Sequence, residues 1–135
     1  MYKFLLLLPS LAFGSDLFCL TQNIYHEARG ESLKGQIAVG FVTVNRTLNE
    51  DFPSNICAVV HQECQFSWRC KVTEPINYEE WYEARKVAEN ILNNKYVNPI
   101  PGSVYYYNPR QSRPSWGRKY CTKYTTIENH RFCSS

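Results

Sequence analysis

The side chains best suited to acid–base chemistry lie in residues 23–31, which read NIYHEARGE. On a helix, Glu27 follows Ile24 by three residues and Leu20 by seven, so it falls at the edge of an apolar stripe near the helix C-terminus. Partial burial and the negative end of the helix dipole both favour the protonated carboxyl group that a general acid needs. We therefore predict a general acid at Glu27, with a surface ion pair to Arg29, Arg46 or a lysine as the alternative.

Other catalytic patterns fail on residue type or spacing. His26 and Glu27 begin like a zinc-protease helix, but Gly30 stands where the second histidine ligand belongs. The sequence contains no Gly-Lys-Ser/Thr phosphate loop and no Gly-x-Ser-x-Gly elbow. Glu31 falls in a turn, and none of the remaining acids lies in a motif for an activated nucleophile. A mechanism with one carboxylate is therefore simpler to draw than that of a hydrolase with two carboxylates.

The N-terminal residues have the pattern of an export signal. Lys3 supplies a positive charge, and residues 4–13 are mostly apolar. The sequence Ala12-Phe13-Gly14 then places small residues where signal peptidase requires them. This run is well short of the roughly 20 residues that a membrane-spanning helix needs. We predict a signal peptide over residues 1–14 and a secreted or periplasmic domain over residues 15–135. An uncleaved anchor or a buried N-terminal helix is the alternative.

The composition indicates one folded domain. The chain has 135 residues, of which 44% are hydrophobic and 20% charged, and this excludes a disordered chain and a multidomain assembly. The formal net charge of +3 is too small to indicate binding to nucleic acid. Aromatic residues make up 15%, which suits both core packing and stacking against sugars or bases. We expect a monomer.

Disulfides are the expected state of the cysteines. An even number of cysteines behind an export signal favours disulfides over free thiols, but the sequence does not select their pairing. A metal site with His61 is the alternative, although the spacings lack the C-x2-C knuckle of zinc sites. A cysteine nucleophile would need a free thiol. The six residues are Cys19, Cys57, Cys64, Cys70, Cys121 and Cys133.

Helical spacing and capping residues predict four helices, and turn residues followed by alternating residues predict a small sheet. The helices run from a cap at Ser15 or Asp16 to Gly30, from Ser32 to Leu48, over residues 55–61, and from Asn77 to residues 93–94. The sheet holds a strand over residues 104–107 and a hairpin of residues 120–126 and 130–133. The fold class is therefore α+β, mainly helical, with a small antiparallel sheet.

Polar and aromatic residues suited to a sugar cleft surround these elements. Core packing and ligand stacking are equally open for Trp68 and Tyr106, because about half of the side chains in an alternating strand face inward. Asn108, at the end of a strand, is better placed to bind. The full set is Gln65, Phe66, Ser67, Trp68, Tyr105, Tyr106, Tyr107, Asn108 and Trp116.

Several blocks of the sequence resemble the SleB-type cell-wall hydrolases, which include spore-cortex-lytic enzymes. The blocks follow the family's order along nearly the whole chain after residue 14. They are IYHEARGES (24–32), GQIAVG (35–40), VNR (44–46), FPSNIC (52–57), VV (59–60), QFSW (65–68), YYYNP (105–109) and IENHRF (127–132). In one departure, Glu128 stands where a small residue, usually Gly, is expected.

The resemblance implies a compact lysozyme-like domain that cuts peptidoglycan between N-acetylmuramic acid and N-acetylglucosamine, often as a lytic transglycosylase. The family's motif glutamate corresponds to Glu27, which would serve as the acid and base without a metal or cofactor. The resemblance further implies that Gln65, Ser67, Tyr107 and Asn108 hold the sugars.

Two other functions remain open from the sequence. An N-acetylmuramoyl-L-alanine amidase would cut the stem peptide and leave the glycan strand intact. A disulfide-stabilised wall-binding module would use its tyrosines as a platform and cut nothing.

Overall fold

The computed structural model describes residues 2–66 and 75–135, which form a mainly helical domain with a small antiparallel sheet. This is the predicted fold class. The elements are α1 (Tyr2–Ala28), α2 (Leu33–Thr47), α3 (Ile56–Phe66), α4 (Tyr78–Leu92), β1 (Tyr105–Tyr107), α5 (Gly117–Tyr120), β2 (Lys123–Ile127) and β3 (His130–Ser134).

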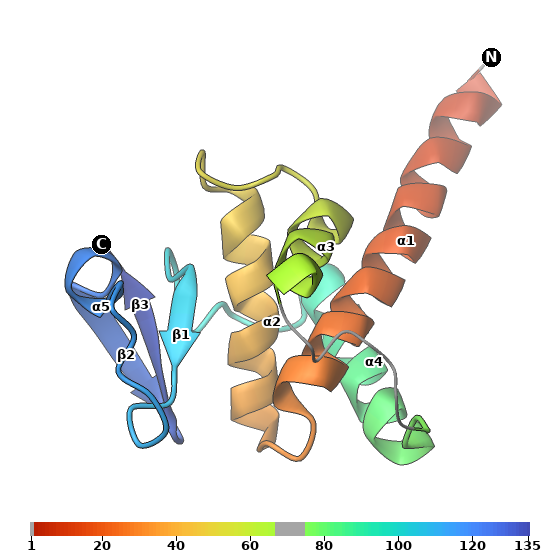
Figure 1. Ribbon diagram of the computed structural model, residues 1–135. Helices are drawn as coiled ribbons and strands as arrows, with labels where there is room; N and C mark the ends of the chain where they lie inside the picture. The colour runs from red at the N-terminus through yellow and green to blue at the C-terminus, as the bar shows by residue number, and fades with distance from the viewer. Residues whose placement is uncertain (1, 67–74) are drawn as a thin grey trace.

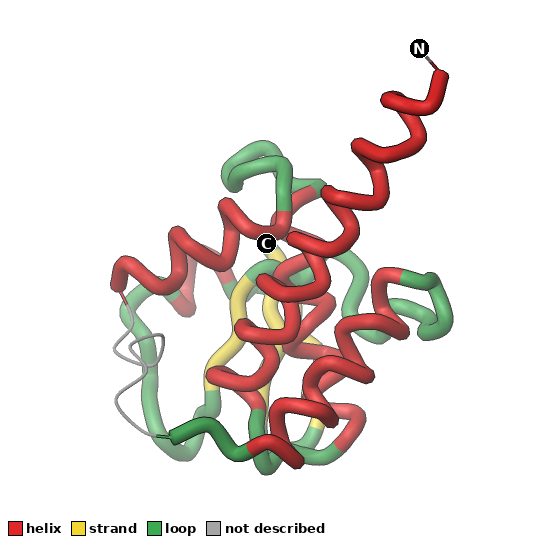
Figure 2. The backbone as a smooth tube through the Cα atoms, turned by 90° about the vertical axis from the view of Figure 1, so that its right-hand side faces the viewer, coloured by secondary structure: helices red, strands yellow, loops and turns green. Residues whose placement is uncertain are grey.

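Helix α2 lies at the centre of the molecule. Figure 1 shows the sheet on one side of α2 and the helices α1, α3 and α4 on the other. The core fills the space between these layers with fully buried side chains such as Leu20 and Ile24 of α1, Val42 of α2 and Phe132 of β3. The N-terminal part of α1 projects from this body in both views (Figures 1 and 2).

Helix α1 begins earlier than the sequence predicted. The predicted cap at Ser15 or Asp16 is wrong, because α1 already starts at Tyr2 and both residues lie inside it. The preceding residues are rich in leucine, a strong helix former, so no capping residue is needed at that point. The predicted end is correct: α1 stops at Ala28, and Gly30 adopts a φ of 80° that favours glycine.

The close approach of α1, α2 and α4 depends on Gly40. A Cβ atom at this position would lie 2.5 Å from Cδ1 of Ile91 and 3.0 Å from Cδ1 of Ile24. Only glycine lets the α2 backbone come this near to its neighbours without moving their side chains. Because Ile24 is about one turn before Glu27, this contact also positions the end of α1.

The predicted caps of α2 and α4 are confirmed. The Ser32 hydroxyl accepts a hydrogen bond from the Gly35 amide at 3.2 Å, and the Asn77 side chain accepts one from the Glu80 amide at 3.1 Å. Helix α3 is longer than the predicted residues 55–61, since it continues to Phe66.

The three strands form an antiparallel sheet in the order β1-β3-β2. Tyr106 of β1 pairs with Phe132 of β3, and Ile127 pairs with His130 at the end of the β2–β3 hairpin. Only two residues connect these strands, and the first, Glu128, has a φ of 54°. Such a turn usually places glycine there, because other side chains are strained at positive φ.

Replacing Glu128 with Gly should therefore raise the free energy of unfolding by about 0.5–1 kcal/mol. Glu128 is exposed, so its side chain removes little packing. Urea unfolding of the wild type and the variant measures the difference. The variant Asn129→Gly serves as the control, because Asn129 has no positive φ; equal or lower stability of Glu128→Gly would contradict the prediction.

Two disulfides join distant parts of the described chain. Cys19 of α1 pairs with Cys57 of α3, and Cys121 pairs with Cys133 of β3. Cys64 is disulfide-bonded as well, whereas Cys70 lies outside the described residues. The prediction of disulfides is confirmed for the five cysteines that the structure describes.

Within residues 2–66 and 75–135, none of the helices is both long and apolar enough to cross a membrane.

Candidate active site

A cleft of about 440 Å³ opens where the end of α1 meets α2, α3 and the sheet side of the molecule. It is lined by carboxylates, one guanidinium group and aromatic rings, a combination typical of sites that bind and process polar ligands. The lining includes Glu27, Arg46, Glu63, Tyr106, Tyr107, Asn108, Trp116 and His130.

Glu27 lies one residue before the end of α1, and its half-buried side chain faces this cleft. The Tyr106 hydroxyl donates a hydrogen bond to Glu27 Oε2 at 3.0 Å. The two residues are 79 positions apart in the chain, so the sheet holds the tyrosine against the end of the helix. This hydrogen bond fixes the orientation of the carboxyl group within the cleft.

The ring of Tyr106 belongs to the core, whereas its hydroxyl belongs to the site. The ring stacks on Phe132 with centroids 5.5 Å apart and meets His130 edge-on at 5.7 Å. Burial raises the pKa of the Tyr106 hydroxyl well above its usual value, and the nearby carboxylates of Glu27 and Glu63 add to this shift. Tyr106 therefore remains a neutral hydrogen-bond donor to Glu27 at physiological pH.

The second carboxylate in the cleft, Glu63 of α3, has both oxygens occupied by protein partners. Arg46 Nη1 forms an ion pair with Oε1, and Asn23 Nδ2 donates a hydrogen bond to Oε2 at 2.8 Å. Asn23 is in turn held by Thr43, whose hydroxyl donates to Asn23 Oδ1 at 2.9 Å. These bonds hold Glu63 as a fixed acceptor and leave it poorly suited to act as a nucleophile.

Arg46 joins α2 to the sheet and to Glu63. Its Nε donates a hydrogen bond to the Val104 carbonyl at 2.8 Å, and its guanidinium carbon lies 4.9 Å from the ring centre of Phe52. Burial raises the pKa of the Glu63 carboxyl, the Arg46 charge lowers it, and the Glu27 charge raises it again. The site thus places two acids within electrostatic reach of each other, and Arg46 supplies the countercharge of Glu63.

Two of the four predicted sugar-binding residues share the cleft with Glu27. Tyr107 and Asn108 both line it. The Asn108 side chain also shapes the following loop, because its Oδ1 accepts a hydrogen bond from the Arg110 amide at 2.9 Å. Gln65 lies in the last turn of α3, but its side chain falls outside the described residues, as do Ser67 and Trp68.

An aromatic cluster forms one wall of the cleft. Trp116 meets the Tyr107 ring edge-on with centroids 5.6 Å apart and lies 5.2 Å from the Tyr105 ring. Tyr106 points to the opposite face of the strand, against Phe132. The alternation expected of β1 is therefore observed, and it separates the core-facing tyrosine from the two that contact Trp116.

Sequence reasoning missed Glu63 and His130 as residues of this site, Arg46 as the partner of Glu63, and Tyr106 as the partner of Glu27. One signal was available for Glu63. It follows Val59 and Val60 by four and three residues, so it shares a helical face with two buried side chains. A carboxylate in that position needs a partner, and the sequence offered none nearby.

Among the residues that the structure describes, no three His, Cys, Asp or Glu side chains lie close enough together to hold a metal ion.

Comparison with known proteins identifies the family. Residues 30–133 match the family model described as Cell Wall Hydrolase. The spore cortex-lytic enzyme of Halalkalibacterium halodurans is 31% identical over 102 residues, covering 76% of this chain and 30% of that enzyme. The spore cortex-lytic enzyme of Bacillus subtilis is 30% identical over 123 residues, covering 89% and 38%. The chain thus spans about a third of the length of these relatives, 30% of the first and 38% of the second.

Solved structures show the same fold. The catalytic domain of the Bacillus cereus SleB protein aligns with a TM-score of 0.67 at 25% identity, covering 90% of this chain and 91% of that domain. The catalytic domain of the germination-specific lytic transglycosylase SleB from Bacillus anthracis aligns with a TM-score of 0.67 at 24% identity, covering 89% and 94%. By the match over residues 30–133 and this shared fold, the chain belongs to the cell wall hydrolase family.

Proposed function

We propose that this chain cleaves the glycan strand of peptidoglycan between N-acetylmuramic acid and N-acetylglucosamine as a lytic transglycosylase, with Glu27 as its single acid and base. The observation that carries the proposal is the arrangement of the two carboxylates. Glu27 lines the cleft and accepts a hydrogen bond from the Tyr106 hydroxyl. Both oxygens of Glu63 are already bonded to Arg46 and Asn23.

The contrast between the two acids favours a mechanism with one carboxylate. A retaining glycosidase needs a second carboxylate as nucleophile, and an inverting one needs it as a base for water. Glu63 is bound to Arg46 and Asn23 and would have to break those bonds to serve in either role. A transglycosylase avoids this requirement, since its nucleophile is a hydroxyl group of the substrate.

The reaction then needs two proton transfers at Glu27. The protonated carboxyl group donates its proton to the glycosidic oxygen as the bond to the muramic acid C1 breaks. The resulting carboxylate takes the proton of the muramic acid 6-hydroxyl, whose oxygen bonds to C1 and closes a 1,6-anhydro ring. Glu27 ends the cycle protonated, so water is not consumed.

The remaining cleft residues would bind and orient the sugars. Tyr107 and Asn108 lie in the cleft with Glu27 and would position the sugar rings, with Trp116 as an aromatic wall. Gln65 and Ser67 stay proposed sugar-binding residues on the resemblance of the QFSW block. The neutral Tyr106 hydroxyl would hold Glu27 in one orientation through both proton transfers.

We also propose that residues 1–14 form a signal peptide and that the domain acts outside the cytoplasm. The mostly apolar sequence of this segment supports the proposal. The projection of the N-terminal part of α1 from the packed body supports it too. The disulfides agree with an oxidising compartment.

Digestion of purified peptidoglycan followed by mass spectrometry of the soluble products tests the function. We expect muropeptides that end in 1,6-anhydro-muramic acid. Products with reducing ends would show hydrolysis instead, and new amino termini with intact glycan strands would show an amidase. Binding to sacculi without any released fragment would support the wall-binding module and contradict the proposal.

A further inference from the structure

A second hollow lies next to the cleft, on the sheet side of the molecule. It has a volume of about 820 Å³ and is lined largely by the loop between β1 and α5. Tyr107 and Pro114 line both the cleft and this hollow, so the two are adjacent. We call it the arginine groove, because four of its lining residues are Arg110, Arg113, Arg118 and Arg131.

The groove concentrates positive charge. Residues 103–135 hold six basic side chains and one acidic one, whereas residues 1–102 hold nine basic and eleven acidic ones. The single acid, Glu128, is not among the groove residues. The modest net charge of the whole chain therefore hides a strongly basic C-terminal quarter and a slightly acidic remainder.

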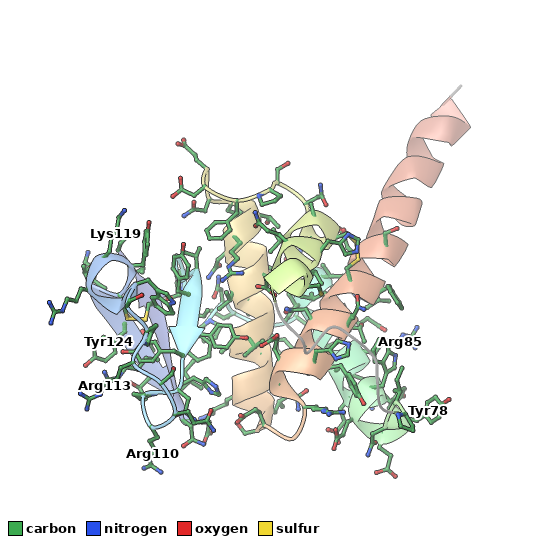
Figure 3. The ribbon with its side chains drawn as sticks, in the orientation of Figure 1. Tyr78, Arg85, Arg110, Arg113, Lys119 and Tyr124 are labelled. Atoms are coloured by element: carbon green, nitrogen blue, oxygen red, sulfur yellow. A yellow bond between two sulfur atoms is a disulfide. The ribbon has the colours of Figure 1, made fainter. Side chains whose placement is uncertain are left out.

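These arginines have no acidic partner in the part of the chain that the structure describes. Across residues 2–66 and 75–135, none of the four forms an ion pair with an Asp or Glu. Arg110, Arg113 and Arg118 are exposed, and Figure 3 shows Arg110 and Arg113 extending from the sheet side into solvent. Arg131 is held in place, because its Nη1 donates to the Tyr107 hydroxyl at 3.4 Å and its guanidinium carbon lies 4.8 Å from the Tyr124 ring centre.

A guanidinium group presents a planar set of donors that matches a carboxylate group. The next step rests on the proposed function. In peptidoglycan, each muramic acid bears a stem peptide, and stem peptides have free carboxylate groups. A muramic acid bound at Glu27 would project its peptide away from the glycan strand. Tyr107, which lines both hollows, connects the sugar-binding cleft to the groove.

We propose that the arginine groove binds the carboxylates of the stem peptide attached to the muramic acid at the cleavage site. The groove thereby makes the enzyme selective for glycan strands that still carry their peptides. Wall polymers with phosphate groups have a similar charge, but a polymer joined to the 6-hydroxyl of the muramic acid that is cut would block the ring closure of the proposed reaction. The adjacency of groove and cleft therefore favours the peptide.

The test uses two matched substrates. One is a soluble preparation of uncrosslinked glycan strands with their stem peptides, and the other is the same preparation after an amidase has removed the peptides. The double variant Arg113→Gln/Arg118→Gln should raise KM on peptide-bearing strands about three- to tenfold, as expected for two exposed charged contacts. The value of kcat on these strands and both constants on peptide-free strands should stay unchanged.

A charge-matched control is available on α4. Arg85 and Lys86 are exposed, and Figure 3 shows Arg85 on the helical side of the molecule, away from Arg110 and Arg113. The variant Arg85→Gln/Lys86→Gln removes the same two charges and should leave both KM values unchanged. Added salt should reduce the preference of the wild type for peptide-bearing strands, since exposed charges are screened.

Three outcomes would overturn the proposal. The first is an equal change of KM on both substrates, and the second is no change on either. The third is an effect that appears only with sacculi retaining their phosphate polymers, which would assign the groove to phosphate.

Calorimetric titration of both strand preparations into Glu27→Gln protein, with and without the groove substitutions, measures binding independently of cleavage. If wild type cuts neither strand, the proposed function fails, and this titration still decides the groove.

Discussion

Replacing Glu27 with Gln should lower the rate of glycan cleavage by about 10²–10⁴-fold, the usual contribution of a general acid–base residue. The amide has nearly the same shape and can still accept the hydrogen bond from the Tyr106 hydroxyl. It can neither give a proton to the glycosidic oxygen nor take one from the 6-hydroxyl. The release of anhydro-muropeptides over time measures the change in kcat.

The matched control is Glu31→Gln. Glu31 lies four residues further along, beyond the end of α1, and does not line the cleft. This variant should keep wild-type activity, and both variants should show the same circular dichroism spectrum and the same unfolding midpoint within error. A Glu27→Gln enzyme that retained a tenth or more of the wild-type rate would remove Glu27 from the mechanism.

Replacing Arg46 with Met should reduce the free energy of unfolding by about 3 kcal/mol. The side chains of Arg46 and Glu63 are only 13% and 20% exposed, so the substitution leaves a largely buried carboxylate without its countercharge. It also removes the hydrogen bond to the Val104 carbonyl, which ties α2 to the start of the sheet. Denaturant unfolding measures the loss, and the exposed Arg85→Met is the control.

The loss should depend on pH in a defined direction. Burial already raises the pKa of Glu63, and without Arg46 the opposing influence disappears, so the folded-state pKa rises further. When the pKa of a carboxyl group is higher in the folded state than in the unfolded state, the group destabilises the fold fully at pH values above its folded-state pKa. At pH values below its unfolded-state pKa the group is protonated in both states and has no effect on stability. Arg46→Met should therefore be most destabilised at neutral pH and approach the wild type as the pH falls.

A double-mutant cycle isolates the ion pair. Arg46→Met/Glu63→Gln should recover part of the lost stability, since it removes the uncompensated charge and keeps an acceptor for Asn23. Additive losses in the double variant, or a loss in Arg46→Met that does not change with pH, would show that the pair is not coupled as the structure indicates.

Local features of this protein were predictable from the sequence. The caps at Ser32 and Asn77 and the end of α1 before Gly30 depend on residues within a few positions of one another. The hairpin was predicted for the same reason, although its first strand begins at Lys123 and not at Tyr120, which belongs to the unpredicted helix α5. The placement of Glu27 at the edge of a buried helix face was also predicted. The predicted start of α1 was wrong because no local signal separates the apolar N-terminal residues from the helical residues that follow them.

The partners of Glu27 depended on tertiary structure. Tyr106 reaches it from a strand 79 residues away, and Glu63 and Arg46 arrive from two other helices. Their meeting requires α2 to approach α1 and α4 at Gly40 and β1 to pair in register with β3. Residue type and helical spacing therefore determined which side chain could donate a proton. Packing alone decided that Arg46 meets Glu63 and that Tyr106 meets Glu27, because contacts between distant segments leave no periodic trace in the chain.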